Sequence, residues 1–216
     1  MLKSVKVPPH FEPPFARAEQ FVEGLFSQFE RAPEKGTLHV GGERYVLVRA
    51  ESFYLSWFEA MSESFGEEAA QQFIYNSARE IGRSDSRAFS ERLKLTDGLD
   101  RLSSGPVHFA HAGWAFVDIL PDSAPAANEQ YFLHYFHPNT FEGEVVRKRG
   151  KTLAQCGCFF SAGYSAGWCS EAFQLEVHGR ELRCVGKGDD TCEFVMAPFD
   201  KLDEHSERVR AGWQKP

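Results

Sequence analysis

Residues 158–192 read CFFSAGYSAGWCSEAFQLEVHGRELRCVGKGDDTC, and this stretch decides how the C-terminal half of the chain is organised. It contains Cys158, Glu181, Cys184 and Cys192, in the spacing Cys-x22-Glu-x2-Cys-x7-Cys. Three thiolates and one carboxylate complete a tetrahedral shell around Zn²⁺ and leave no position for a reacting water. The residue types therefore favour a structural zinc site over a catalytic one.

The spacing alone leaves alternatives open. Cys-x7-Cys is not a standard zinc-finger spacing, so buried free cysteines with a surface glutamate are the competing interpretation. On a strand over 175–185, Glu181 and Cys184 would face opposite sides unless a bulge, or a strand end at Arg183, brings them together. Cys156 is the substitute if Cys158 is not the first ligand.

The composition limits the classes of partner. The chain has 216 residues and a formal net charge of −7, and its basic residues gather only in the short patch 147–151. We therefore expect no direct contact with nucleic acid. No apolar run resembles a signal peptide or reaches the length of a membrane span, and the cysteines suit metal in a reducing compartment, so we expect a cytoplasmic protein.

The order of elements indicates an α+β fold in which helices flank an antiparallel sheet. We expect an extended arm over 1–14, a helical region with an early hairpin over 15–112, and a ligand- and zinc-binding region over 113–212. The predicted helices cover 15–32, 51–65, 67–94, 99–104, 141–149, 157–173 and 199–210. The predicted strands cover 37–48 as a hairpin, then 113–120, 129–137, 175–185 and 191–196.

Several of these stretches resemble a known family. GYSAGWCSEAF (163–173), Glu-x2-Cys (181–184) and GKGDDTCEFVMAP (186–198) are similar to the 4-vinyl-reductase-type small-ligand-binding domain. The resemblance is to the N-terminal sensor region of xylene- and phenol-responsive bacterial transcription activators, and it spans about residues 15–210. Upstream, GTLHVGGERYVLV, SGPVHFAHAGW and NTFEGE resemble the early hairpin, the pocket entrance and a helix start of that region.

The resemblance implies a fold related to the nitric-oxide-signalling and Golgi-transport ligand-binding domains, with a C-terminal zinc-bound subdomain. The zinc ligands of the family fall on Cys158, Glu181, Cys184 and Cys192. The resemblance also implies a homodimer and a buried pocket for a small aromatic effector.

The pocket departs from the phenol sensors at two positions. A histidine and a tryptophan that hydrogen-bond the phenolic hydroxyl in those sensors align with Phe109 and His137. Phe109 has no polar atom for this bond, so His137, His108 or His111 would have to supply it. We expect a larger or less polar aromatic, or another class of ligand, in place of phenol. The other pocket candidates are aromatic: Trp114, Phe132, Tyr135 and Trp168.

The expected function is that of a sensor, not an enzyme. The chain has no Gly-x-Ser-x-Gly elbow, no nucleotide-binding glycine loop and no helix-turn-helix signal, so it reads as an excised sensor or a stand-alone member. The alternatives are an accessory protein of tetrapyrrole reduction and a scaffold with a lipid-filled cavity. For the sensor we expect a structural zinc and a small hydrophobic or aromatic ligand as the partner.

Overall fold

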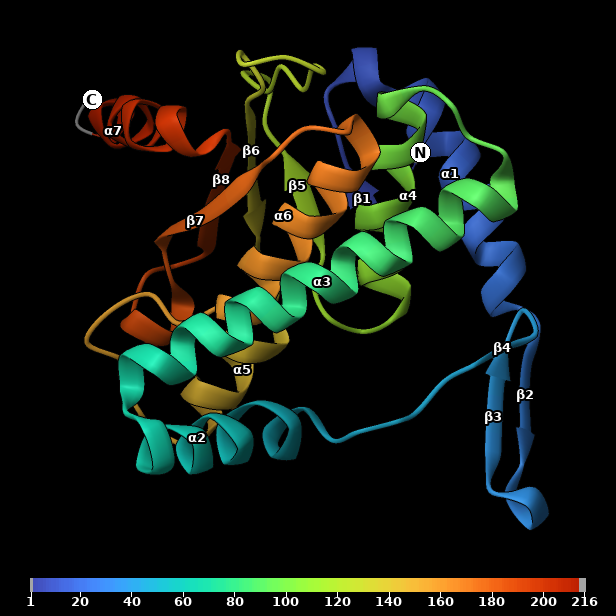
Figure 1. Cartoon of the computed structure of the whole chain (residues 1–216), viewed down its shortest axis with the longest axis horizontal. Coiled ribbons are helices and arrows are strands. Elements are labelled where there is room, and N and C mark those ends of the chain that lie inside the picture. Colours follow the sequence, from blue (N-terminus) through green and yellow to red (C-terminus); the bar gives the residue numbers. More distant parts are fainter. Residues whose placement is uncertain (1, 214–216) are drawn as a thin grey trace.

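A five-stranded sheet forms the centre of the molecule, which the computed structural model describes for residues 2–213 (Figure 1). Its strand order is β1-β5-β6-β8-β7, and every neighbouring pair is antiparallel except β1 and β5. The strands are β1 (Val5–Lys6), β5 (Val117–Ile119), β6 (Leu133–His137), β7 (His178–Arg183) and β8 (Cys192–Ala197). The predicted α+β class, with a largely antiparallel sheet, is confirmed.

Helices cover both faces of this sheet. They are α1 (Glu12–Phe26), α2 (Trp57–Phe65), α3 (Glu67–Leu93), α4 (Gly98–His111), α5 (Phe141–Lys148), α6 (Phe159–Phe173) and α7 (Leu202–Gly212). Helix α6 packs against the main core, with α3 behind it, and α7 covers the opposite face through Leu202 and Val209. None of the helices described here is both long and apolar enough to cross a membrane.

The contact between α3 and α6 depends on glycine. A Cβ atom at Gly163 would lie 2.2 Å from the Tyr75 carbonyl oxygen, and one at Gly167 would lie 1.9 Å from that of Arg79. The same holds in the other direction, because a Cβ atom added at Gly82 on α3 would lie 2.1 Å from the carbonyl oxygen of Tyr164 on α6. The small residues of α6 therefore allow two helix backbones to touch, and Gly82 does not break α3.

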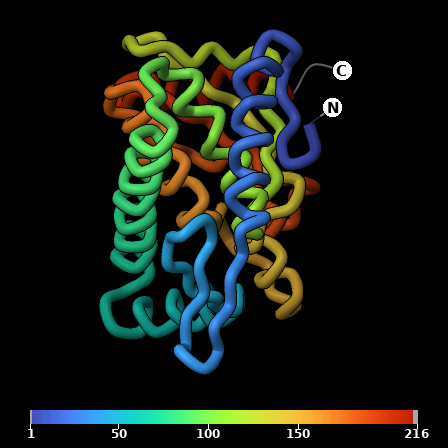
Figure 2. Tube along the Cα trace, turned by 90° about the vertical axis from the view of Figure 1, so that its right-hand side faces the viewer, coloured from blue at the N-terminus to red at the C-terminus, as the bar shows by residue number. Residues whose placement is uncertain are grey.

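A second, three-stranded sheet extends from the end of α1, away from the central sheet (Figure 2). Its strands are β2 (Phe29–Ala32), β3 (Thr37–Val40) and β4 (Glu43–Arg44), in the order β2-β3-β4. The hairpin predicted over 37–48 is present and turns at Gly41–Gly42. Its second strand ends at Arg44 and not at Val48.

Three predictions from the N-terminal half are wrong. The arm over 1–14 holds β1 and the start of α1, because residues 5–6 pair with β5. The helix over 15–32 ends at Phe26, because residues 29–32 pair with β3 instead. The helix over 99–104 continues through Gly105 and Pro106 to His111, and a Cβ at Gly105 would lie 2.8 Å from the Trp168 ring. Tertiary packing there overrides the Gly-Pro stop signal.

Candidate metal centre and adjoining cavity

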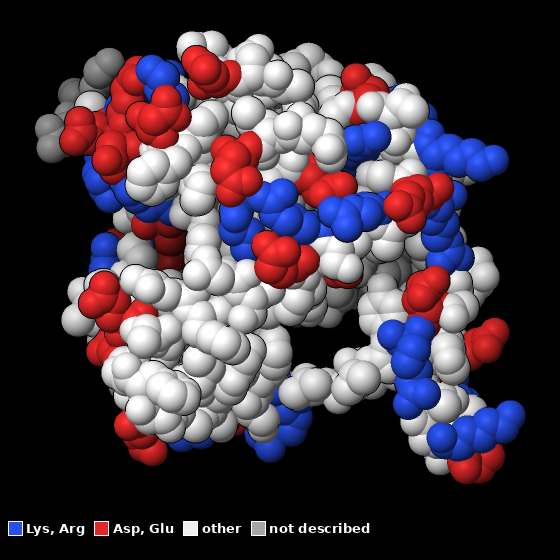
Figure 3. Space-filling view, in the orientation of Figure 1, with Lys and Arg blue, Asp and Glu red and all other residues white. Residues whose placement is uncertain are grey.

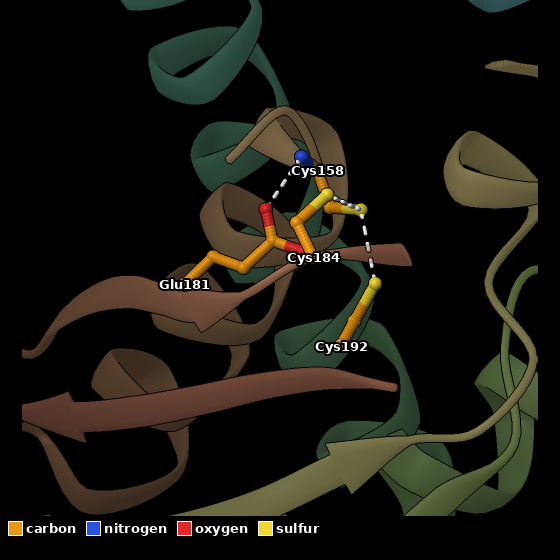
Figure 4. A group of neighbouring side chains, drawn as sticks. All are labelled: Cys158, Glu181, Cys184 and Cys192. Carbon is orange, nitrogen blue, oxygen red and sulfur yellow. Dashed lines mark hydrogen bonds between the residues drawn. The ribbon is translucent and has the colours of Figure 1, made fainter. Parts of the chain in front are cut away.

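Four side chains from three elements meet at one end of the central sheet (Figure 4). One ligand atom from each of Cys158, Glu181, Cys184 and Cys192 lies within 4.8 Å of all the others. The Sγ atom of Cys158 is 3.9 Å from that of Cys184 and 3.6 Å from that of Cys192. Cys156 lies outside this cluster.

Local structure explains how these residues converge. The pairing of β7 with β8 shifts register between Glu181 and Arg183, and β7 ends at Arg183, so both of the features expected to bring Glu181 and Cys184 together are found. Cys158 precedes the first residue of α6, and its backbone N–H donates to Glu181 Oε2 at 2.8 Å. The backbone N–H of Cys184 donates to Asp189 Oδ2 at 2.8 Å, which fixes the turn that returns the chain to Cys192.

The donor set fits a tetrahedral zinc ion. Sulfur atoms about 2.3 Å from a shared Zn²⁺ would lie about 3.8 Å apart, close to the observed separations. Glu181 Oε1 is buried and has no hydrogen-bond partner among the described residues, so a cation would satisfy it. The backbone N–H of Val185 also donates to Cys192 Sγ at 3.3 Å, as expected around a thiolate ligand.

Glu142 ties α5 to the start of α6. Its carboxylate accepts the backbone N–H groups of Phe160 at 2.9 Å and Ser161 at 3.1 Å, which are donors without partners inside the helix. Burial raises the pKa of Glu142 to about 8. Glu142 lies in the first turn of α5, and its place in the sequence gives no sign of this second contact with α6.

A small cavity lies between the central sheet, α4 and α6. Its lining is uncharged and consists of Leu102, Gly105, Pro106, Phe109, Val117, Ile119, Leu133, Tyr135, Tyr164, Ser165, Trp168 and Cys169. Its volume is about 30 Å³, which is room for water-sized molecules and too little for an aromatic ring. An aromatic guest would therefore have to displace part of the wall.

The structure brings only some of the predicted pocket residues to this cavity. Phe109, Tyr135 and Trp168 line it. His137 is buried beside Phe109, with 5.5 Å between ring centroids, and neither of its ring nitrogens has a partner within the described chain. Burial lowers the pKa of His137 to about 3, so the ring is neutral.

The remaining candidates lie elsewhere. Phe132 packs with α7 on the opposite face of the sheet, 4.6 Å from the ring of His205, and this placement does not support a role in the cavity. Trp114, His108 and His111 line a separate hollow beside the second sheet. The cavity wall also contains Tyr164 and Ser165, which were not among the predicted pocket residues although they lie in the GYSAGWCSEAF stretch.

His108 forms part of a buried polar chain. The Tyr164 hydroxyl lies 2.9 Å from Asp85 Oδ2, to which it donates, and 3.1 Å from His108 Nδ1. The Tyr45 hydroxyl lies 3.3 Å from His108 Nε2. Burial, helped by His111, lowers the pKa of His108 to about 4. A neutral His108 then donates to Tyr164 and accepts from Tyr45, so these polar groups satisfy one another.

Comparisons with known proteins agree with this arrangement. No protein-family model matches the chain. It is 21% identical over 148 residues to the phenol regulator MopR of Acinetobacter guillouiae, and the match covers 68% of this chain but 26% of that protein. It is 27% identical over 132 residues to an uncharacterized protein, MJ0150, of Methanocaldococcus jannaschii, covering 61% of this chain and 67% of that protein.

One of the solved structures similar to this chain shows the same fold. The phenol-responsive sensory domain of the transcription activator PoxR, solved with phenol, aligns with a TM-score of 0.74 at 20% identity, covering 97% of this chain and 100% of that one. A trafficking protein particle complex subunit 3 from Naegleria fowleri aligns with a TM-score of 0.45 at 14% identity over 68% of this chain and 93% of its own. The resemblance to phenol-responsive sensor domains, predicted from the sequence, is confirmed.

Proposed function

We propose that this chain is a zinc-containing sensor that holds a small, uncharged, hydrophobic ligand between α4, α6 and the central sheet. The observation that carries the proposal is the position of α6. Its first turn follows Cys158, and its middle supplies Tyr164, Ser165 and Trp168 to the cavity wall. A metal bound at one end of this helix would fix one wall of the ligand site.

The cavity wall selects the chemistry of the ligand. No charged side chain lines it, so a buried carboxylate or ammonium group would find no partner there. The apolar faces of an aromatic ring would gain about 25 cal/mol for each Å² removed from water. The Tyr135 hydroxyl, which has no partner among the described residues, and the Ser165 hydroxyl, with His137 behind Phe109, are available to a single polar substituent. The site recognises its ligand and has no group placed to transform it.

Ligand entry would be the signalling event. Because the cavity holds about 30 Å³, a ring can enter only if α4 or the side chains of α6 move. In a cytoplasmic homodimer that movement would reach the partner chain. The bound Zn²⁺ would hold Cys158, Glu181, Cys184 and Cys192 together and supply no reacting water.

Isothermal titration calorimetry against a panel of ring compounds tests the proposal. Phenol, a cresol, a xylene and naphthalene cover increasing size and decreasing polarity, and benzoate serves as the charged control. We expect at least one neutral compound to bind with a negative heat-capacity change, and benzoate not to bind. Absence of binding by every neutral compound, or binding of benzoate alone, would contradict the proposal.

A further inference from the structure

An exposed apolar segment follows the second sheet. Residues 45–49, here called the strap, follow β4 but belong to no strand, and they cross an opening in the molecule toward α2 (Figure 3). Val46 and Leu47 are each 75% exposed and Val48 is 58% exposed. Three consecutive exposed aliphatic residues are unusual for a surface that faces only water.

The strap also has unused backbone hydrogen-bonding groups. Strand β4 is an edge strand, and among the described residues Val46, Leu47 and Val48 make no backbone hydrogen bond. Glu43 pairs with Val40 across the Gly41–Gly42 turn, and the Tyr45 N–H donates to the Leu38 carbonyl at 2.9 Å. Because the backbone groups of alternate residues point to opposite sides of a strand, extending β4 through Val46 would turn those of Arg44 and Val46 away from β3.

We propose that the strap pairs with the strap of a second copy of this chain, as antiparallel strands related by a two-fold axis at Val46. The proposed function includes a homodimer, and this pairing would place its interface at the strap and define which residues lie opposite each other. The inference rests on the homodimer and not on the ligand site. Each Val46 would exchange both of its backbone hydrogen bonds with its counterpart, and the outward-facing Arg44 would pair with Val48. The exposed aliphatic side chains of both copies would then cover one another.

Charge selects this register over its neighbour. With the axis at Val46, Glu43 of each copy lies opposite Arg49 of the other, which gives two ion pairs across the dimer. With the axis at Leu47, Glu43 would lie opposite Glu51, which places like charges together. The Arg49 side chain is 79% exposed, and its one ion pair among the described residues is with Glu51. Glu51 has a second partner in Arg149, so Arg49 is free to change partner. A two-fold axis that passes between two residues would place outward-facing backbone groups of one copy opposite inward-facing groups of the other, so the two strands could not form hydrogen bonds in that register.

A second copy fits this surface better than a small molecule does. The hollow behind the strap has a volume of about 980 Å³ and is bordered by the strap, the second sheet and α3. A small ligand there would leave the outer edge of the strap unpaired and exposed to water. An identical strand satisfies the apolar side chains and the backbone groups at the same time.

Sedimentation velocity of the full chain over 1–100 µM tests the pairing. We expect a dimer for the wild-type chain and a monomer for Val46→Lys, which would place two lysines directly opposite each other at the axis. Phe199→Lys is the matched control, since Phe199 is also 75% exposed but lies near α7, and it should remain a dimer. Circular dichroism and the thermal midpoint show whether each variant is folded.

A charge swap tests the register. Glu43→Arg and Arg49→Glu should each raise the dimer dissociation constant about tenfold, because each converts two attractive pairs into repulsive ones. The double variant should restore the wild-type constant. A wild-type monomer, or a folded Val46→Lys dimer, would overturn the pairing. A double variant no tighter than the single ones would overturn the register. Ligand titration by calorimetry is read separately, so these outcomes leave the proposed ligand site untouched.

Discussion

At the scale of single residues, the candidate metal centre depends on one oxygen atom. Glu181 Oε2 accepts the Cys158 N–H, whereas Oε1 is buried and no described residue satisfies it. Leaving such an atom without a partner costs about 1–3 kcal/mol, and more for a charged group. A cation bound between Oε1 and the three cysteine sulfur atoms would remove that cost. The cluster is therefore better explained as a ligand set than as a group of packed cysteines.

Removing one ligand should remove the metal. Cys184→Ala leaves three donors and an open position, so we expect zinc content to fall from about one ion per chain toward zero. The free energy of unfolding should fall by several kcal/mol, because a structural zinc stabilises the local fold. Elemental analysis and thermal denaturation measure both quantities.

Cys156→Ala is the control for this experiment, because Cys156 lies outside the cluster although it is two residues from Cys158. Its zinc content should equal that of the wild-type chain. Full zinc content in Cys184→Ala, or loss of zinc in Cys156→Ala, would show that the ligands have been misassigned.

Phe109 is the residue where ligand polarity should be adjustable. It lines the cavity and has no polar atom, whereas the phenol sensors are expected to have histidine there. Phe109→His should raise the affinity for phenol about 3- to 10-fold, the usual net contribution of one hydrogen bond. Calorimetry measures the change. Phe109→Leu keeps the site apolar and should give no gain, so equal gains from both variants would point to cavity size and not to polarity.

At the scale of elements, the sequence predicts the regular parts and misses those set by distant contacts. The helices over 67–94 and 157–173 and the strand pair ending at 196 are close to α3, α6, β7 and β8. Small and aromatic residues mark α6, and the turn at 188–190 separates the two strands. Strand β2 was hidden inside a helical pattern, because its pairing with β3 is not local. The four candidate metal ligands could be found from residue type and resemblance. The cavity wall could not, because Tyr164 and Ser165 are ordinary helix residues until the helix is placed against the sheet.

One polar network links the outer face of the sheet to the C-terminal helix. His134 contacts Asp122 at 3.0 Å through Nδ1 and Glu193 at 2.8 Å through Nε2. Glu193 also contacts Arg183 at 3.3 Å, and the Arg183 guanidinium lies 4.1 Å from the centre of the Trp213 ring, just after α7. Burial by itself lowers the pKa of His134, but the two carboxylates raise it above its usual value overall.

The stability contributed by His134 should therefore depend on pH. A raised folded-state pKa means that the contribution is fully present below the unfolded value of about 6.5 and is lost as pH rises through the folded value. We expect His134→Gln to lower the free energy of unfolding by about 1.5–3 kcal/mol at pH 6, and by less at pH 9. Urea denaturation of both chains across this range measures the difference. His10→Gln, at an exposed position, should show no such trend, and a His134→Gln effect that grew with pH would contradict the assignment.

At the scale of the whole molecule, α6 connects the features that matter for function. It contacts α3 through glycines, receives the Glu142 carboxylate at its first turn, follows the candidate metal ligand Cys158 and lines the cavity. Because α6 belongs to both the candidate metal centre and the cavity wall, a movement of the helix that favours binding at one site also changes the geometry of the other. Coupling of this kind is reciprocal in binding free energy.

Zinc and ligand should therefore stabilise each other's binding. Removing zinc with a strong chelator frees the start of α6, so the aromatic compound that calorimetry identifies should bind at least 10-fold more weakly to the metal-free chain, and adding Zn²⁺ back should restore its affinity. By the same linkage, saturating ligand should slow the loss of zinc to a chromogenic chelator. Far-ultraviolet circular dichroism must show that the metal-free chain is still folded, because a chain that has unfolded would lose ligand binding for a different reason. If a folded, metal-free chain bound the ligand with unchanged affinity, the metal would only stabilise the fold, and α6 would not couple zinc binding to ligand binding.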